Sequence, residues 1–154
     1  MAERSVTHST FVIKRHFDAA PARVFNAFAD PKAKARWFAG PPEWTSSKFE
    51  MDFRVGGRDF SRVGPPGGTV HAFSAIYHDI VPNERIVFSY DMHLDETRVS
   101  VSLTTVELKP DGAGTSLTFT EQGAFFYGPD DAVERERGTR GLLDALGRSL
   151  QPDQ

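Results

Sequence analysis

Glu121 is the residue whose type and setting most favour chemistry in this sequence. Residues 117–121 alternate between apolar and polar, so Glu121 shares one face of a predicted strand with Leu117 and Phe119. A carboxyl group in apolar surroundings has a raised pKa and can act as a general acid or base. We therefore take Glu121 as the catalytic candidate. The alternative is that it lies near the strand end, meets solvent or pairs with an arginine, and carries no chemistry.

Tyr90 is the second polar candidate, because it shares a face of its strand with Ile86 and Phe88. Its hydroxyl could point into the same cavity as Glu121. A core tyrosine whose hydroxyl meets a neighbouring backbone carbonyl is the alternative. Trp37 ends a predicted short helix, where it either lines the mouth of a cavity or plugs the core.

His71, Phe73 and Tyr77 have the same parity in another predicted strand and are secondary candidates for the cavity wall. The chain has no cysteine, and its five histidines show neither HxH nor HxxxH spacing: His8, His16, His71, His78 and His93. We therefore expect no metal site and no other cofactor. Neither a GxSxG elbow nor a glycine-rich loop opening a helix occurs, so a hydrolase triad and a nucleotide site lack support.

Composition excludes several classes of function. The 154 residues carry a formal net charge of −3, so no basic excess is present to hold a nucleic acid. No apolar stretch approaches the roughly 18 residues of a membrane helix. The N-terminus lacks the apolar region of a signal peptide, and a cytoplasmic location is expected. Thirteen phenylalanines offer large flat surfaces that suit a hydrophobic pocket as well as ordinary packing.

Periodicity predicts the elements that position these residues. Strands are expected over 10–17, 48–54, 58–63, 69–79, 84–92, 97–108 and 115–122. Two short helices are expected, one opened by Asp18 or Ala20 before Pro21 and one running from Pro31 to Phe38. A final helix, capped by Asp130 or Asp131, is expected to run to about Leu150.

The apolar residues of the strand predicted over 97–108 fall in two phases, first Val99, Val101 and Leu103, then Val106 and Leu108. A bulge near Thr104–Thr105 would reconcile the phases and help the sheet bend. On the outer face of the sheet, exposed Val87, Val99 or Val101 could support a homodimer.

The final helix has a predicted buried stripe and a charged outer face. The stripe comprises Val133, Leu142, Leu143, Leu146 and Leu150, and the outward set comprises Glu134, Arg135, Glu136, Arg137 and Arg140. Gly138 and Gly141 adjoin the stripe, where glycine lowers helix stability. They leave room either for close packing or for a ligand. The order of elements predicts an α+β domain in which one long helix covers a curved antiparallel sheet of about seven strands, with a cavity between them.

Six segments carry a resemblance to a known family: residues 21–28 (PARVFNAF), 36–38 (RWF), 53–58 (FRVGGR), 80–90 (IVPNERIVFSY), 120–125 (TEQGAF) and 137–146 (RGTRGLLDAL). With this order of elements, the chain resembles the START/Bet v 1-like (SRPBCC) superfamily and its helix-grip fold. It is most similar to bacterial proteins related to the activator of heat shock protein 90 ATPase, also described as polyketide-cyclase-like. The resemblance implies one START-like domain over 1–154.

Pattern and resemblance together predict a ligand site under the final helix, lined by Trp37, Phe53, His71, Phe73, Tyr77, Phe88, Tyr90, Phe119, Glu121 and Leu142. The first hypothesis is a binder of a small hydrophobic, lipid-like or polyketide-like molecule. The second is a cyclase- or hydrolase-like enzyme that uses Glu121, with Tyr90 and His71 orienting the substrate. The third, a chaperone ATPase regulator, rests on the resemblance alone, and 154 residues leave no room for the further domain such activators normally carry.

Overall fold

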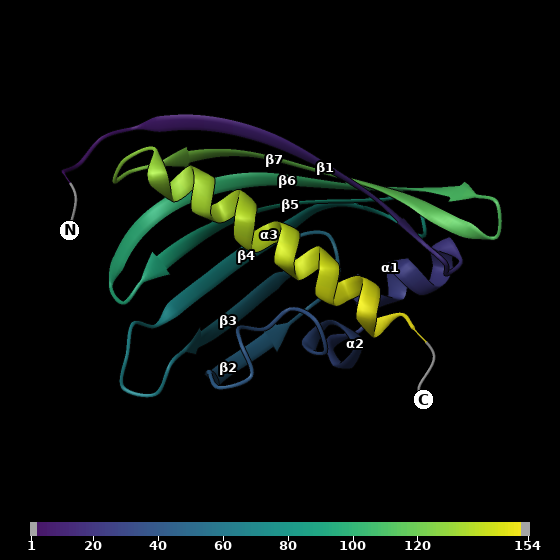
Figure 1. The fold of residues 1–154 in the computed structure, drawn as a ribbon, viewed down its shortest axis with the longest axis horizontal. Coiled ribbons are helices and arrows are strands. Elements are labelled where there is room, and N and C mark those ends of the chain that lie inside the picture. The colour runs from purple at the N-terminus through teal and green to yellow at the C-terminus, as the bar shows by residue number, and fades with distance from the viewer. Residues whose placement is uncertain (1–2, 152–154) are drawn as a thin grey trace.

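One curved antiparallel sheet organises the chain, whose residues 3–151 are described by a computed structural model (Figure 1). The elements in chain order are β1 (Thr7–Phe17), α1 (Pro21–Ala29), α2 (Pro31–Ala35), β2 (Thr45–Met51), β3 (Arg58–Gly64), β4 (His71–Val81), β5 (Arg85–Leu94), β6 (Thr97–Asp111), β7 (Gly114–Phe125) and α3 (Asp130–Ser149). The strand order is β1-β7-β6-β5-β4-β3-β2. This arrangement confirms the predicted α+β helix-grip fold.

Local sequence explains where the elements begin and turn. Proline occupies the first position of both short helices, where its missing N–H is no loss. The side chain of Asp30 accepts a hydrogen bond from the Lys32 backbone N–H (3.2 Å) and caps α2, which ends three residues before the predicted Phe38. Asn83 and Asp95 have φ values of 66° and 53°, and they turn the chain between neighbouring strands.

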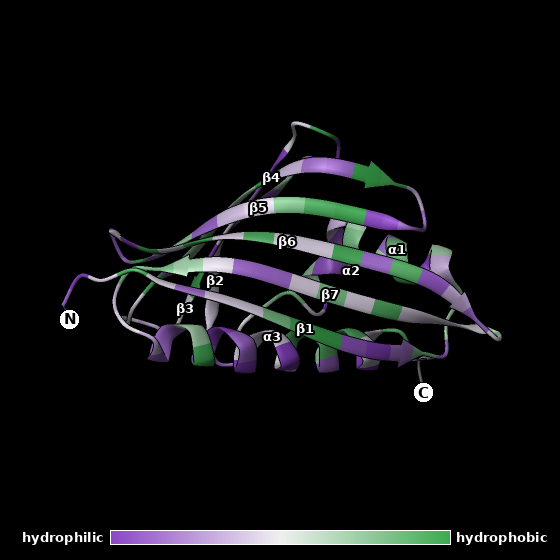
Figure 2. Cartoon of the chain, turned by 90° about the horizontal axis from the view of Figure 1, so that it is seen from above, coloured by the Kyte–Doolittle hydropathy of each residue, from purple (hydrophilic) through white to green (hydrophobic). Residues whose placement is uncertain are grey.

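Helix α3 lies across the concave face of the sheet (Figure 1), alongside β1 as seen from above (Figure 2). Its C-terminal half is anchored in the core by Leu143 and Leu146, which are 1% and 0% exposed. A Cβ added at Gly147 would lie 3.2 Å from the Phe17 ring, so glycine lets the helix approach β1 closely there. The N-terminal half of α3 lines the cavity described below with Asp131, Glu134, Arg135, Gly138 and Thr139.

Three predictions about α3 were wrong. The N-cap is Pro129, and neither Asp130 nor Asp131 caps the helix; both lie in its first turn, where their charge suits the helix dipole. Val133 is 60% exposed, whereas the Arg135 side chain turns inward. The reason is helical spacing: the buried row that includes Leu143 and Thr139 continues to residue 135 and leaves residue 133 outside.

The bulge predicted near Thr104–Thr105 is also wrong. β6 pairs with β7 without interruption from Ser100 to Asp111, and the irregularity lies in the pairing with β5, between Met92 and His93. From Ser100 to Leu108, the even-numbered residues of β6 therefore face inward. The pattern misled because the first inward residues are hydroxylic: Ser100, Ser102 and Thr104.

The outer face differs from the prediction at one of its three valines. Val99 is buried at 7% exposure, because it lies at the irregularity with β5, whereas Val101 is 43% exposed and Val87 is half-buried. Leu103 is also exposed on this face. A homodimer through the outer face stays a prediction.

The anchoring of α3 can be tested with a matched pair of variants on the same helix. We expect Leu146→Ala to lower the free energy of unfolding by about 2–5 kcal/mol, because it removes a fully buried side chain and leaves a cavity. Val133→Ala should change it by less than about 0.5 kcal/mol, because that side chain meets solvent. Urea unfolding measures both. Equal effects of the two substitutions would contradict the orientation of α3.

Candidate functional site

A cavity of about 570 Å³ lies between α3 and the concave face of the sheet. Its volume falls in the range of roughly 300–1,000 Å³ that is usual for small-molecule sites. Eight of the ten predicted residues line it: Trp37, His71, Phe73, Phe88, Tyr90, Phe119, Glu121 and Leu142. The full lining comes from five strands, β3 to β7, and from all three helices, which the curvature of the sheet brings to one space.

Phe53 and Tyr77 do not line this cavity. The two rings pack edge to face, with centroids 4.9 Å apart, and Phe53 also contacts Phe25 of α1 at 5.6 Å. Parity correctly turns Tyr77 inward, but α1 and the 53–57 loop fill that end of the sheet. Trp37 combines its two predicted roles, because it lines the cavity and also packs on Phe28 (4.9 Å) while its indole N–H donates to the Ala27 carbonyl (2.9 Å).

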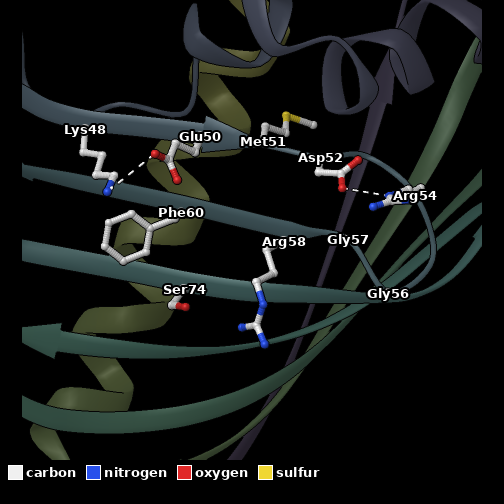
Figure 3. A pocket seen from close by; sticks show the side chains of 10 residues that line it. All are labelled: Lys48, Glu50, Met51, Asp52, Arg54, Gly56, Gly57, Arg58, Phe60 and Ser74. Carbon is white, nitrogen blue, oxygen red and sulfur yellow. Dashed lines mark hydrogen bonds and ion pairs between the residues drawn. The ribbon is translucent and has the colours of Figure 1, made fainter.

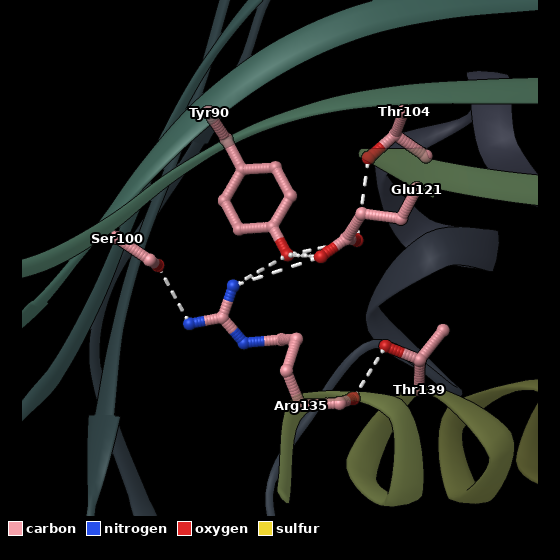
Figure 4. Close-up of polar contacts among 6 residues, drawn as sticks. All are labelled: Tyr90, Ser100, Thr104, Glu121, Arg135 and Thr139. Carbon is pink, nitrogen blue, oxygen red and sulfur yellow. Dashed lines mark hydrogen bonds and ion pairs between the residues drawn. The ribbon is translucent and has the colours of Figure 1, made fainter. Parts of the chain in front are cut away.

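A buried polar cluster joins α3 to the sheet at the cavity wall (Figure 4). The Tyr90 hydroxyl lies 2.9 Å from each carboxylate oxygen of Glu121 and donates to that group. Arg135 of α3 donates from Nη1 to the Tyr90 oxygen (2.9 Å) and from Nη2 to Ser100 Oγ (2.8 Å). Its Nη1 is 3.7 Å from Glu121 Oε2, and Thr104 donates to Glu121 Oε1 at 3.3 Å. The carboxylate is thus held in one orientation.

Burial sets the electrostatics of this cluster. Glu121 is 2% exposed, and its desolvation raises its pKa, although the Arg135 charge and the hydrogen bonds from Tyr90 and Thr104 oppose the rise. Burial, reinforced by the neighbouring carboxylate, also raises the pKa of Tyr90. Glu121 therefore pairs with an arginine, as the alternative held, but inside the cavity and not in solvent. Tyr90 bonds this carboxylate and not a backbone carbonyl.

His71 takes a different place from the one expected in the enzyme hypothesis. Its ring lies 4.9 Å from the Trp44 ring, and no hydrogen bond links it to Glu121 or Tyr90 within residues 3–151. Burial and the positive charge of Arg135 lower the pKa of His71 against the opposing pull of Asp95. His71 thus contributes a mostly neutral wall and does not orient the carboxylate.

A second polar cluster, missed by the sequence analysis, lies at the α2 side. Lys34 of α2 is 4% exposed and forms an ion pair with Asp59 of β3, which is 1% exposed. The Tyr77 hydroxyl donates to the same Asp59 oxygen at 2.9 Å, and Lys34 Nζ lies 3.4 Å from the Tyr77 oxygen. Burial lowers the pKa of Lys34 against the effect of Asp59 and raises that of Tyr77.

The two glycines of α3 adjoin open space. A Cβ added at Gly138 or Gly141 would have no atom within 4 Å, so close packing does not explain either residue. Gly138 lines the cavity, whereas Gly141 does not. The interpretation that glycine leaves room for a ligand therefore applies to Gly138.

A second concavity, of about 650 Å³, opens on the outer face beside β2, β3 and β4 (Figure 3). Its charged groups largely satisfy one another: Lys48 lies 3.5 Å from Glu50, and Arg54 lies 2.8 Å from Asp52. Because these exposed pairs need no ligand to balance them, the cavity under α3 is the better candidate site.

Within residues 3–151, no group of three or more histidine, cysteine or acidic side chains is arranged to hold a metal ion. In the same residues, no helix has the length and apolar character needed to span a membrane.

Comparison with known proteins gives a family match and a consistent set of solved structures. Residues 18–151 match the family described as Activator of Hsp90 ATPase homolog 1-like protein. The Mll3558 protein from Rhizobium loti is 52% identical, with a TM-score of 0.88, covering 95% of this chain and 99% of that one. An uncharacterised protein from Rhizobium leguminosarum is 46% identical, with a TM-score of 0.90 and coverage of 96% and 97%. No curated protein matches.

A more distant structure shares the fold alone. CalU16 from Micromonospora echinospora is 21% identical, with a TM-score of 0.64, and the alignment covers 99% of this chain and 87% of that one. The family and fold are thereby established, and they confirm the resemblance to the START-like superfamily.

The raised pKa of Glu121 predicts how stability depends on pH. The folded protein holds this proton more tightly than the unfolded chain does, so the associated stability is present below pH 4.5 and is lost as pH rises through the raised pKa. The glutamine of Glu121→Gln cannot ionise. We therefore expect the free energy of unfolding of this variant, relative to that of the original protein, to increase as pH rises through that window. Urea unfolding from pH 4.5 to neutral pH measures the difference. A difference that stays constant or changes in the opposite direction would contradict the assignment.

Proposed function

The chain belongs to the family of Activator of Hsp90 ATPase homolog 1-like proteins, and we propose that it binds a small, mostly apolar molecule in the cavity under α3. The observation that carries this proposal is the pairing of an aromatic cavity with a fixed polar group. Phe73, Phe88 and Phe119 supply apolar surface, and Glu121 with Arg135 supplies hydrogen-bonding groups in the wall. Such a mixture is typical of small-molecule sites.

Charge balance favours a neutral ligand. Glu121 and Arg135 compensate each other inside the cavity, and Lys34 and Asp59 do the same at the α2 side. An anionic ligand would add an uncompensated charge to a region of low dielectric, at a considerable cost in free energy. The acidic residues Asp131 and Glu134 of α3 also line the site and would repel it. A hydroxyl or carbonyl group suits the available donors and acceptors better.

The cavity also favours ligand binding over chaperone regulation. A partner of protein size needs an outer surface, whereas strongly desolvated polar groups of this site, such as Glu121 and Tyr90, lie inside. Groups of this kind mark functional sites more often than ordinary surface charges do.

The glycines of α3 provide a matched test of ligand binding. A leucine at residue 138 would project into the cavity, whereas Gly141→Leu would enter open space outside it. Both substitutions should raise helix stability by up to about 1 kcal/mol. We expect Gly138→Leu alone to weaken binding of 2-naphthol, a fluorescent two-ring alcohol, by about tenfold or more. Fluorescence titration measures it, and native mass spectrometry of gently purified protein checks for a retained ligand.

Two results together would contradict the proposal. They are the absence of any retained small molecule and equal 2-naphthol binding by the Gly138→Leu and Gly141→Leu variants.

Catalysis at the same cavity is the second candidate function, and one observation favours it. Glu121 and Tyr90 converge within 2.9 Å, as the enzyme hypothesis required. Glu121 could remove a proton from a carbon next to a ligand carbonyl, leaving the electron pair to form an enolate. A guanidinium has five N–H groups, and Arg135 uses two in its bonds to Tyr90 and Ser100, so others can stabilise the enolate oxygen.

Isotope exchange tests this second candidate. The ketone 2-tetralone exchanges the hydrogens beside its carbonyl for deuterium in heavy water, which proton NMR follows directly. We expect the protein to accelerate exchange above the buffer rate and Glu121→Gln to reduce that acceleration by about 10²-fold or more. Unchanged acceleration in Glu121→Gln would exclude this carboxylate as the base. A protein that binds 2-tetralone without any acceleration would point to binding alone.

A further inference from the structure

Lys34 has more hydrogen-bonding capacity than its neighbours use. An ammonium group has three N–H donors. Two of them face oxygen atoms, in Asp59 and, at the long distance of 3.4 Å, in Tyr77. Among the residues that the structure describes, no oxygen accepts from the third. The Phe38 ring faces the ammonium group, with its centroid 4.6 Å from Nζ, but offers no oxygen acceptor. Because Lys34 lines the cavity and its side chain is only 5% exposed, a ligand oxygen that accepts from this donor would lie inside the cavity.

Asp59 shows the complementary shortage. Its Oδ2 atom bonds both Lys34 and Tyr77, but its Oδ1 atom is buried with no hydrogen-bond partner in residues 3–151. An unpaired buried oxygen of a carboxylate costs free energy that one hydrogen bond recovers. The cluster of Lys34, Asp59 and Tyr77 thus lacks partners for one donor and one acceptor. Of these three residues only Lys34 lines the cavity, so a ligand oxygen there can accept a hydrogen bond from Lys34.

The same aromatic wall borders this cluster and the cluster around Glu121. The Phe73 ring centroid lies 5.8 Å from Lys34 Nζ and 4.7 Å from the Tyr90 ring. The Phe88 centroid lies 6.0 Å from Lys34 Nζ and 6.1 Å from the Tyr90 ring. A flat apolar molecule packed against Phe73 and Phe88 would therefore have Lys34 near one edge and the Glu121 cluster near another.

We propose that Lys34 is a second polar contact in the cavity, so that the ligand is a mostly apolar ring compound with oxygen functions at two separated positions. This inference rests on the proposed function and narrows it to a chemical class. One oxygen function meets Glu121, Tyr90 and Arg135, and the other accepts a hydrogen bond from Lys34. A purely aliphatic or singly oxygenated ligand would leave the Lys34 donor unused.

The ion pair of Lys34 with Asp59 also ties α2 to β3, so a structural role has to be separated from ligand contact. Breaking a buried pair by changing one partner is strongly destabilising, because it leaves an uncompensated charge. The single substitution Lys34→Met is therefore accompanied by the pair Lys34→Met with Asp59→Asn, which removes both charges and keeps an oxygen for Tyr77. Lys32→Met, on the exposed face of the same helix, is the control.

The test compares two probes that differ by one hydroxyl group, 2-naphthol and 2,6-dihydroxynaphthalene. A hydrogen bond to a charged group corresponds to about a tenfold gain in affinity, so the original protein and Lys32→Met should prefer the diol by about that factor. The preference should disappear in the paired variant, while affinity for 2-naphthol stays within about threefold. Nitrogen NMR of the Lys34 ammonium group should show a shift on addition of the diol and a smaller one with 2-naphthol.

Each outcome decides between distinct conclusions. Equal affinity of the original protein for the two probes, or a diol preference that survives in the paired variant, would overturn the role of Lys34 and leave the proposed function intact. Failure of both probes to bind the original protein would count against the proposed function itself. A paired variant that loses affinity equally for both probes would show that Lys34 only supports the shape of the cavity.

Discussion

The pairing of the buried Glu121 carboxylate with Arg135 organises the part of the molecule where α3 lies over β6 and β7. Glu121 points from β7 into an apolar cavity, where a charge without a partner would be very costly. Its counter-charge comes from Arg135, so α3 must place this side chain over the sheet. Arg135 in turn needs an acceptor on β6, which Ser100 supplies. The need to balance the Glu121 charge therefore accounts for three features. They are the position of α3, the inward orientation of Ser100 on β6 and the cluster of polar groups in the cavity wall.

A similar constraint acts at the other helix that closes the cavity. Lys34 joins α2 to Asp59 of β3, and further contact links the ends of the two helices, where Arg36 donates to the Ser149 carbonyl (3.3 Å). Buried ion pairs of this kind add little net stability compared with apolar packing, but they fix geometry well. We infer that the two pairs specify where α2 and α3 sit, whereas burial of Leu143 and Leu146 supplies most of the stability.

Sequence alone predicted the architecture and most of the cavity wall, because alternation and helical spacing report which side of an element is apolar. Glu121 and Tyr90 were found in this way, since each follows two apolar residues of equal parity. Arg135 and Lys34 were missed for the opposite reason, because an isolated cation on a helix is normally solvated. The row of alternating hydroxyl residues at 100, 102 and 104 was the available signal that β6 faced a polar group.

The fold therefore accounts for the cavity under α3, and the side chains that line the cavity determine which ligand it would bind. Relatives with nearly the same backbone include uncharacterised proteins, and a shared fold does not determine a ligand. In this cavity the buried polar groups of Glu121, Tyr90 and Lys34 are already oriented by hydrogen bonds and ion pairs with neighbouring side chains. A ligand need not order them on binding, so most of the cost of fixing those side chains has been met during folding. Such preorganisation favours a rigid ligand, whose own groups are equally fixed, over a flexible chain that would lose rotational freedom in the same space.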